Sequence, residues 1–160
     1  MDTSGSVAEP ADGEDLPIGV LLFILARAME AANMAGLARA GYTDMTVAQA
    51  RIAARIEPGG SRVTRLAESA HVTKQTAGFL VEQLERAGYV ERVPDPSDGR
   101  ARLVRVSARG RAAREAVLPA LAELEAQWLA RIGPERMAQL RETLTQLREV
   151  RDPYLDRDNP

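Results

Sequence analysis

Residues 63–107 of the chain read VTRLAESAHVTKQTAGFLVEQLERAGYVERVPDPSDGRARLVRVS. Apolar residues recur with the period of a helix over Val63–Ala70 and again over Lys74–Ala87. Thr73 is typical of a helix N-cap, and Gly88 is typical of the position just after a helix. A short helix, a tight turn and a longer helix in this order predict a helix-turn-helix.

A hairpin is expected directly after these helices. Tyr89–Val93 and Arg102–Val106 are short and rich in β-branched residues, and the segment Pro94–Ala101 between them is dense in turn formers. This pattern predicts two strands joined by a long loop. The fold class expected is therefore mainly α with a small β-hairpin wing, a winged helix-turn-helix.

Helical patterns flank this segment on both sides. We expect helices over Leu16–Ala40, Thr46–Ile56 and Ala108–Ile132, the last of these kinked at Pro119, and a final helix from Gly133-Pro134 to about Val150. Thr46 is expected to cap the second of these helices and Ser107 the third.

Two of these helices indicate a partner chain. Leu21–Leu25 makes the first half of the N-terminal helix apolar on every face, and a small monomer cannot bury every face of a terminal helix. The final helix carries apolar residues every three or four positions, a seam for another helix. We therefore expect a homodimer.

The predicted division of the chain into regions is a disordered acidic tail (1–15), a helical dimerisation region (16–42 and 112–152), a winged helix-turn-helix DNA-binding domain (43–111) and a C-terminal tail (153–160).

Composition removes several classes of function. The chain has 160 residues, no cysteine and one histidine, which excludes disulfides, cysteine nucleophiles, thiolate zinc sites and histidine metal clusters. No metal, cofactor or catalytic residue is expected, and the protein is not expected to be an enzyme.

The acidic N-terminus does not resemble a secretory signal, and the longest apolar run, Ile18–Ala26, is too short to cross a bilayer. We therefore expect a soluble, cytoplasmic protein with no membrane partner.

Charge is distributed unevenly along the chain. The net charge is -2 overall, but residues 61–111 contain ten basic and six acidic side chains, a local charge of +4. A basic segment within an acidic protein indicates a polyanionic partner, here double-stranded DNA.

The side chains expected at the DNA lie off the apolar stripe of the longer helix and on the wing. Lys74 beside the positive end of the helix dipole suits phosphate, Gln75 suits adenine, and Thr76 or Phe79 suits a thymine methyl group. Arg100 suits the minor groove, with Asp98 orienting its guanidinium. The full predicted set is Arg62, Thr73, Lys74, Gln75, Thr76, Phe79, Asp98, Arg100 and Arg102.

Three parts of the chain together resemble the MarR family of bacterial transcription regulators: residues 73–90, the wing segment Asp95–Arg102, and Val106–Gly110. The resemblance covers about residues 16–150. It implies a homodimer with interlocking terminal helices, two winged lobes, and a palindromic operator. It also implies a small, often phenolic or anionic, effector in a crevice between the dimer helices and the DNA-binding lobe. Met29, Met34, Met45 and Trp128 are candidates to line that crevice, or else belong to the core or the dimer interface.

The chain departs from the family pattern at four positions. Ser61 replaces an apolar residue, Arg62 a capping Ser or Thr, His71 a turn glycine, and Phe79 a residue that is often polar or basic. The function predicted is a sequence-specific dimeric DNA-binding transcriptional regulator, a repressor released by a small ligand. The alternatives are a winged-helix module for protein contact, a ligand-binding protein without specific DNA binding, and, last, an enzyme.

Overall fold

The computed structural model describes residues 16–151. The expected acidic tail (1–15) and C-terminal tail (153–160) lie outside the described residues. The elements in chain order are α1 (Ile18–Arg39), α2 (Val47–Ala53), α3 (Val63–Ala70), α4 (Lys74–Arg86), β1 (Val90–Asp95), β2 (Asp98–Val106), α5 (Ala108–Ala116), α6 (Leu118–Ile132) and α7 (Pro134–Arg151). The chain is thus mainly helical with one antiparallel hairpin, which confirms the expected fold class.

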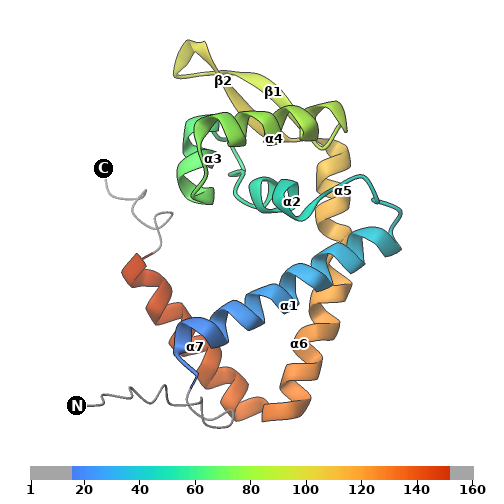
Figure 1. Cartoon of the computed structure of the whole chain (residues 1–160), viewed down its shortest axis with the longest axis vertical. Helices are drawn as coiled ribbons and strands as arrows, with labels where there is room; N and C mark the ends of the chain where they lie inside the picture. The colour runs from blue at the N-terminus through green and yellow to red at the C-terminus, as the bar shows by residue number, and fades with distance from the viewer. Residues whose placement is uncertain (1–15, 152–160) are drawn as a thin grey trace, which may run out of the picture.

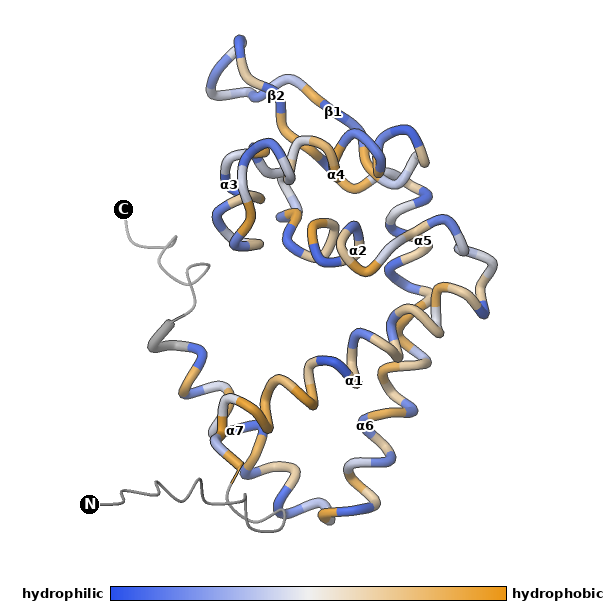
Figure 2. Tube along the Cα trace, viewed as in Figure 1, coloured by the Kyte–Doolittle hydropathy of each residue, from blue (hydrophilic) through white to orange (hydrophobic). Residues whose placement is uncertain are grey.

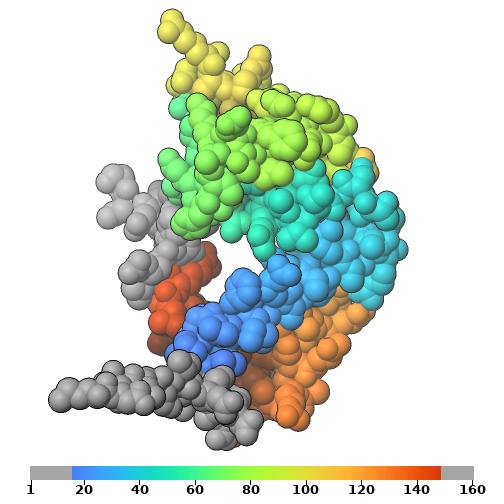
Figure 3. Space-filling view, in the orientation of Figure 1, coloured from blue at the N-terminus to red at the C-terminus, as the bar shows by residue number. Residues whose placement is uncertain are grey.

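The elements form two groups joined by α5 (Figure 1). The helices α2, α3 and α4 pack together beneath the β1–β2 hairpin, which extends from one end of this lobe. The helices α1, α6 and α7 form an arm on the other side, with α1 lying across α6. Figure 3 shows an open notch between α1 and the lobe.

Polar side chains start three helices where the sequence places caps. The Thr46 hydroxyl accepts a hydrogen bond from the Gln49 amide, and the side-chain oxygen of Gln49 accepts one from the Thr46 amide, which completes a capping box. Thr73 caps α4, and Ser107 caps α5. His71 ends α3 in the left-handed region at φ 53°, which is the backbone conformation that a turn glycine would supply.

The core lies in the winged lobe and follows the predicted apolar stripes. Leu66 and Ala67 of α3 and Ala77, Val81 and Leu84 of α4 are buried. They pack with apolar residues of the other elements into one cluster, which includes Leu37, Ile52, Ile56, Tyr89, Val90, Val104 and Ala113. The helical period therefore predicted the inward faces of α3 and α4 correctly.

The wing differs from the expectation of a long loop. The regular ladder runs from Val90 opposite Val106 to Pro94 opposite Arg102, and after a shift in register Asp95 pairs with Asp98, so that Pro96 and Ser97 form the turn. The expected eight-residue loop is wrong because the Asp95 carboxylate accepts hydrogen bonds from the Ser97 amide (2.9 Å) and hydroxyl (2.6 Å) and closes a tight turn. Pro94 fits this arrangement because it lies on an edge strand of a two-stranded sheet.

Two helix boundaries also differ. The second helix ends at Ala53 rather than near Ile56, and the expected kinked helix over residues 108–132 is two helices that meet at Val117. Pro119 lies in the first turn of α6, where a proline needs no amide hydrogen. A proline in this position permits a new helix to begin, so that the chain breaks rather than bends.

The N-terminal half of α1 is apolar (Figure 2), and its side chains are exposed within the single chain. Ile18 and Phe23 are 72% and 63% exposed, whereas Gly36 and Leu37 near the other end are buried. By length and composition α1 could cross a membrane, since its apolar character continues beyond the uninterrupted run at Ile18–Ala26. The same exposure is what a helix in a dimer interface requires.

Candidate nucleic-acid interface

The N-terminal turn of α4 lies on the surface of the lobe. Ala77, Val81 and Leu84 face the core and partly buried Leu80 packs against it, whereas the first turn of the helix precedes this stripe. Lys74, Gln75, Thr76 and Phe79 are all exposed, and Phe79 is 56% exposed. An exposed helix start with a lysine presents unpaired backbone amides and the positive end of the dipole, which suits a phosphate.

Two of the predicted contact residues in this turn bond to each other. The Thr73 hydroxyl accepts a hydrogen bond from the Thr76 amide at 3.1 Å and lies 2.8 Å from the Thr76 hydroxyl. Thr73 therefore has a defined structural role as the N-cap.

The wing presents two exposed arginines, Arg100 and Arg102, on β2. Asp98 fixes the backbone of Arg100, because one oxygen of the Asp98 carboxylate accepts a hydrogen bond from the Arg100 amide at 3.1 Å. The orientation of the Arg100 guanidinium by Asp98 stays a prediction. The wing and α4 belong to the same lobe, and the wing extends beyond α4 (Figure 1).

Arg62 has a different environment from the other predicted contacts. Its guanidinium lies on the carboxylate of Asp95, with Nε at 2.8 Å and Nη2 at 2.6 Å from the same oxygen. Hydrogen bonds from the Ser97 hydroxyl and amide, together with Arg62, lower the pKa of Asp95 to about 2. Asp95 was absent from the predicted set because its partner lies 33 residues earlier in the chain.

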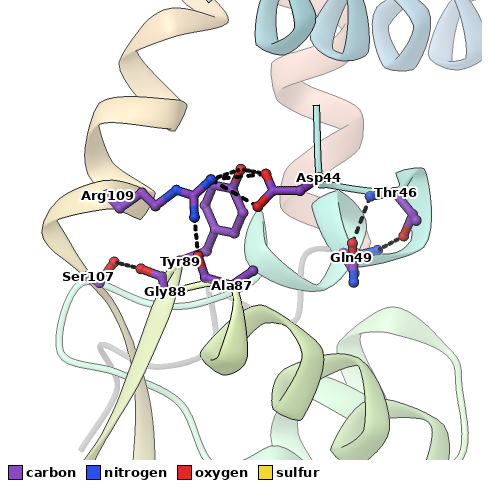
Figure 4. A network of polar contacts seen from close by, with 8 residues as sticks. All are labelled: Asp44, Thr46, Gln49, Ala87, Gly88, Tyr89, Ser107 and Arg109. Carbon is purple, nitrogen blue, oxygen red and sulfur yellow. Dashed lines mark hydrogen bonds and ion pairs between the residues drawn. The ribbon is translucent and has the colours of Figure 1, made fainter. Parts of the chain in front are cut away.

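A second polar network joins the loop before α2 to β1 and α5 (Figure 4). The Tyr89 hydroxyl donates to Asp44 at 2.5 Å, and Arg109 Nη2 lies 3.0 and 2.9 Å from the two Asp44 oxygens. Arg109 also lies over the Tyr89 ring, 4.4 Å from its centroid, and donates to the Ala87 carbonyl. Sequence reasoning missed this network because no short-range pattern brings these three side chains together.

The network makes stability depend on pH at the alkaline end. Burial, with the hydrogen bond to Asp44 and its charge, raises the pKa of Tyr89 to about 12 from 10.0, and Arg109 opposes the shift. The unfolded tyrosine ionises first, so this contribution is complete below pH 10 and is lost as the pH rises toward 12. Between pH 9.5 and 11.5, we expect the free energy of unfolding of the native protein to fall by about 2 kcal/mol more than that of Tyr89→Phe. Urea titrations of both proteins measure this; parallel decreases would contradict it.

Two adjoining pockets lie between α1 and α2, and the first of them extends to α5. The first has a volume of about 120 Å³ and an apolar wall that includes Leu37, Met45, Tyr89 and Val117. The second includes Met34 and shares Asn33 with the first. Of the four side chains proposed for a ligand crevice, the structure thus brings Met45 and Met34 to neighbouring pockets, whereas half-buried Trp128 and exposed Met29 line neither of these two.

Metal coordination has no candidate among residues 16–151, where no group of three or more His, Asp or Glu side chains is arranged to hold an ion.

A helix-turn-helix followed by a hairpin, with the start of its second helix exposed, defines the winged-helix class of DNA-binding folds. Residues 43–101 match the model of the MarR family. A crystal structure of MarR is 27% identical, with a TM-score of 0.68 over 84% of this chain and 96% of that one. A transcriptional regulator from Thermotoga maritima is 25% identical, with a TM-score of 0.61 over 89% of this chain and 99% of its own. The chain is therefore similar to the MarR family of winged-helix transcriptional regulators, by the family model over residues 43–101 and by the fold over most of its length.

A more distant likeness concerns the fold alone. A MepR mutant from S. aureus, bound to an oligodeoxyribonucleotide, is 19% identical with a TM-score of 0.55 over 85% of this chain and 99% of that one. No curated protein matches the chain.

Proposed function

We propose that the protein is a homodimeric, sequence-specific repressor that reads a palindromic operator and is released from it by a small ligand. The observation that carries the proposal is the exposed start of α4, with Lys74 and Gln75, in one lobe with the arginine-bearing wing. Two lobes related by a twofold axis place two α4 helices on half-sites one helical turn apart, about 10 bp centre to centre. The likeness to a MepR mutant bound to an oligodeoxyribonucleotide supports the same reading.

Dimerisation is supported by apolar surface that a single chain leaves in water. Leu21, Leu22, Phe23 and Ile24 of α1 are each at least 43% exposed, and Leu144 and Leu147 of α7 are exposed as well. These residues fall within the proposed dimerisation region, 16–42 and 112–152, while the proposed DNA-binding domain covers 43–111. Burial of these faces against a second copy is consistent with a soluble cytoplasmic protein.

The proposed effector is a single small ring or a compact anion. The pocket of about 120 Å³ is somewhat smaller than an engineered cavity of about 150 Å³ that accepts benzene. It is bounded by α1 and α5 as well as by the winged lobe, so an occupant contacts both sides of the junction. A ligand that prefers one arrangement of arm and lobe shifts the spacing of the two α4 helices.

The direct test is binding to the DNA next to the protein's own gene, with and without small aromatic acids. We expect tight, salt-dependent binding to a palindrome in that fragment and weaker binding when an effector is present. Equal affinity for this fragment and for random duplexes would contradict the proposal.

Lys74→Ala separates phosphate contact from base reading. Because Lys74 lies at the positive end of α4, we expect this variant to weaken binding to all duplexes alike. The slope of log affinity against log salt should fall by about 1 for each lost phosphate contact. Arg86→Ala, at the opposite end of α4 in an exposed ion pair with Glu82, is the matched control. An unchanged slope for Lys74→Ala would show that Lys74 does not contact the DNA backbone.

One observation favours a second candidate function. Phe79 is a large apolar side chain that is 56% exposed on the face proposed to read bases. On DNA it meets a thymine methyl group, but the same side chain also suits a protein partner. A winged-helix module for protein contact would show no salt-dependent binding to DNA, so the fragment test above distinguishes the two.

A further inference from the structure

The arginine directly before α3 contacts both acidic side chains at the end of the wing. Asp95 and Asp98 are facing partners in the last register of the hairpin. Arg62, the residue before the first turn of α3, places Nε and Nη2 on one oxygen of Asp95, and its Nη2 lies 3.6 Å from Asp98. A single guanidinium therefore joins the start of α3 to both strands of the wing.

The other oxygens of the two acids hold the wing turn. Asp95 Oδ1 accepts the Ser97 amide and hydroxyl, and Asp98 Oδ1 accepts the Arg100 amide at 3.1 Å. The backbone of Arg100 is thus two polar contacts away from Arg62. Any displacement of the acids displaces the arginine that is proposed to enter the minor groove.

Charge makes this link necessary. Asp95 is only 5% exposed, and a carboxylate in such a place is costly without a cation beside it. Asp95 and Asp98 also repel each other across the hairpin, and Arg62 is the cation that contacts both. Loss of Arg62 would leave two neighbouring carboxylates at the end of the wing without this cation.

A backbone contact beside Arg62 strengthens the same junction. The Ser61 amide donates to the Val104 carbonyl at 2.9 Å, and the Val104 amide donates to the Ser61 carbonyl at 2.8 Å. Ser61 is buried and β2 is thereby fixed at its middle. Arg62 adds a second point of attachment at the far end, so that wing and helices form one rigid unit.

We infer that Arg62 is a positioning residue that fixes the wing, and with it Arg100, against the start of α3, rather than a residue that binds DNA phosphate itself. The DNA-binding part of this inference rests on the proposed function. The positioning part concerns the free protein and is tested without DNA.

The first experiment measures amide hydrogen exchange at Ser97 and Arg100 in the free full-length protein by NMR. In Arg62→Gln we expect both amides to exchange roughly 10-fold faster, since local opening of the wing becomes easier. Asp95→Asn, which keeps an oxygen for Ser97 but does not pair with Arg62, is expected to act in the same direction at Arg100. The control is Arg105→Gln, which removes the same charge from an exposed ion pair with Glu91 in the same hairpin and leaves both rates unchanged. Unchanged exchange in Arg62→Gln would overturn the inference, whether or not the protein binds DNA.

The second experiment is a double-mutant cycle on a duplex that the native protein selects from a random pool. Arg62→Gln should weaken binding roughly 10-fold in the native background but less than about 2-fold in an Arg100→Ala background, because it acts through Arg100. A direct phosphate contact predicts the same loss in both backgrounds and a salt slope lower by about 1 per contact. It also predicts that Asp95→Asn, which frees Arg62, tightens binding. Either result would overturn the positioning role, whereas failure of the native protein to select any duplex would instead refute the proposed function.

Discussion

Gly110→Ala is expected to lose about 3 kcal/mol or more of its free energy of unfolding, since overpacking of this kind costs 1–3 kcal/mol or more. An added Cβ would lie 2.1 Å from the Tyr89 carbonyl oxygen and 2.8 Å from Val106 Cγ1. The first of these neighbours is backbone and cannot turn aside. The first turn of α5 would have to move away from the base of the wing.

The contacts around Gly110 explain why this movement is costly. The Ser107 amide donates to the Tyr89 carbonyl at 3.0 Å, and the Ser107 hydroxyl donates to the Gly88 carbonyl at 2.5 Å and accepts from the Gly110 amide at 3.1 Å. Moving α5 breaks this cap and displaces Arg109 from Asp44. One added methyl group at Gly110 therefore breaks several contacts of α5.

Urea unfolding followed by circular dichroism measures the effect. Gly78→Ala is the control, because its Cβ meets nothing within 4 Å and alanine favours a helix interior by about 0.5–1 kcal/mol. The control should be as stable as the native protein or more so. A Gly110→Ala protein with native stability would show that α5 does not pack on Tyr89 as described.

Arg100→Ala is expected to have the largest effect on operator binding. Each minor-groove or base contact contributes on the order of 1–3 kcal/mol, and a dimer makes the contact twice, so the affinity should fall by roughly 30-fold to 10⁴-fold. Arg100 is exposed, and its hydrogen bond to Asp98 is made by the backbone amide, so the substitution leaves the wing intact.

A duplex titration at fixed salt measures this loss, with the far-UV spectrum of the variant as a check on folding. Arg105→Ala is a suitable control, since it removes a charge from the same strand at a position paired with Glu91. If Arg100→Ala and the native protein bound the operator with equal affinity, the wing tip would not be part of the DNA interface.

The sequence predicted those features that depend on neighbouring residues. The periods of α3 and α4 gave their buried faces, and the caps Thr46, Thr73 and Ser107 hold where they were expected. Each is a local effect, since an apolar stripe or a cap depends on residues within one or two turns. The exposed start of α4 followed directly from them.

The features that were missed depend on residues far apart in the chain. Arg62 pairs with Asp95 at the end of the wing, and Asp44 holds the junction of β1 and α5. Charged residues at such separations give no periodic signal. Arg62 illustrates the consequence, since its charge alone suggested DNA, whereas its contacts are with the wing.

Selection of duplexes from a random pool by the native protein tests the central claim most directly. The account predicts an enriched palindrome whose half-sites lie about one helical turn apart, as two α4 helices on a twofold axis require. Enrichment of no sequence, or of a single half-site bound by one copy of the chain, would contradict it.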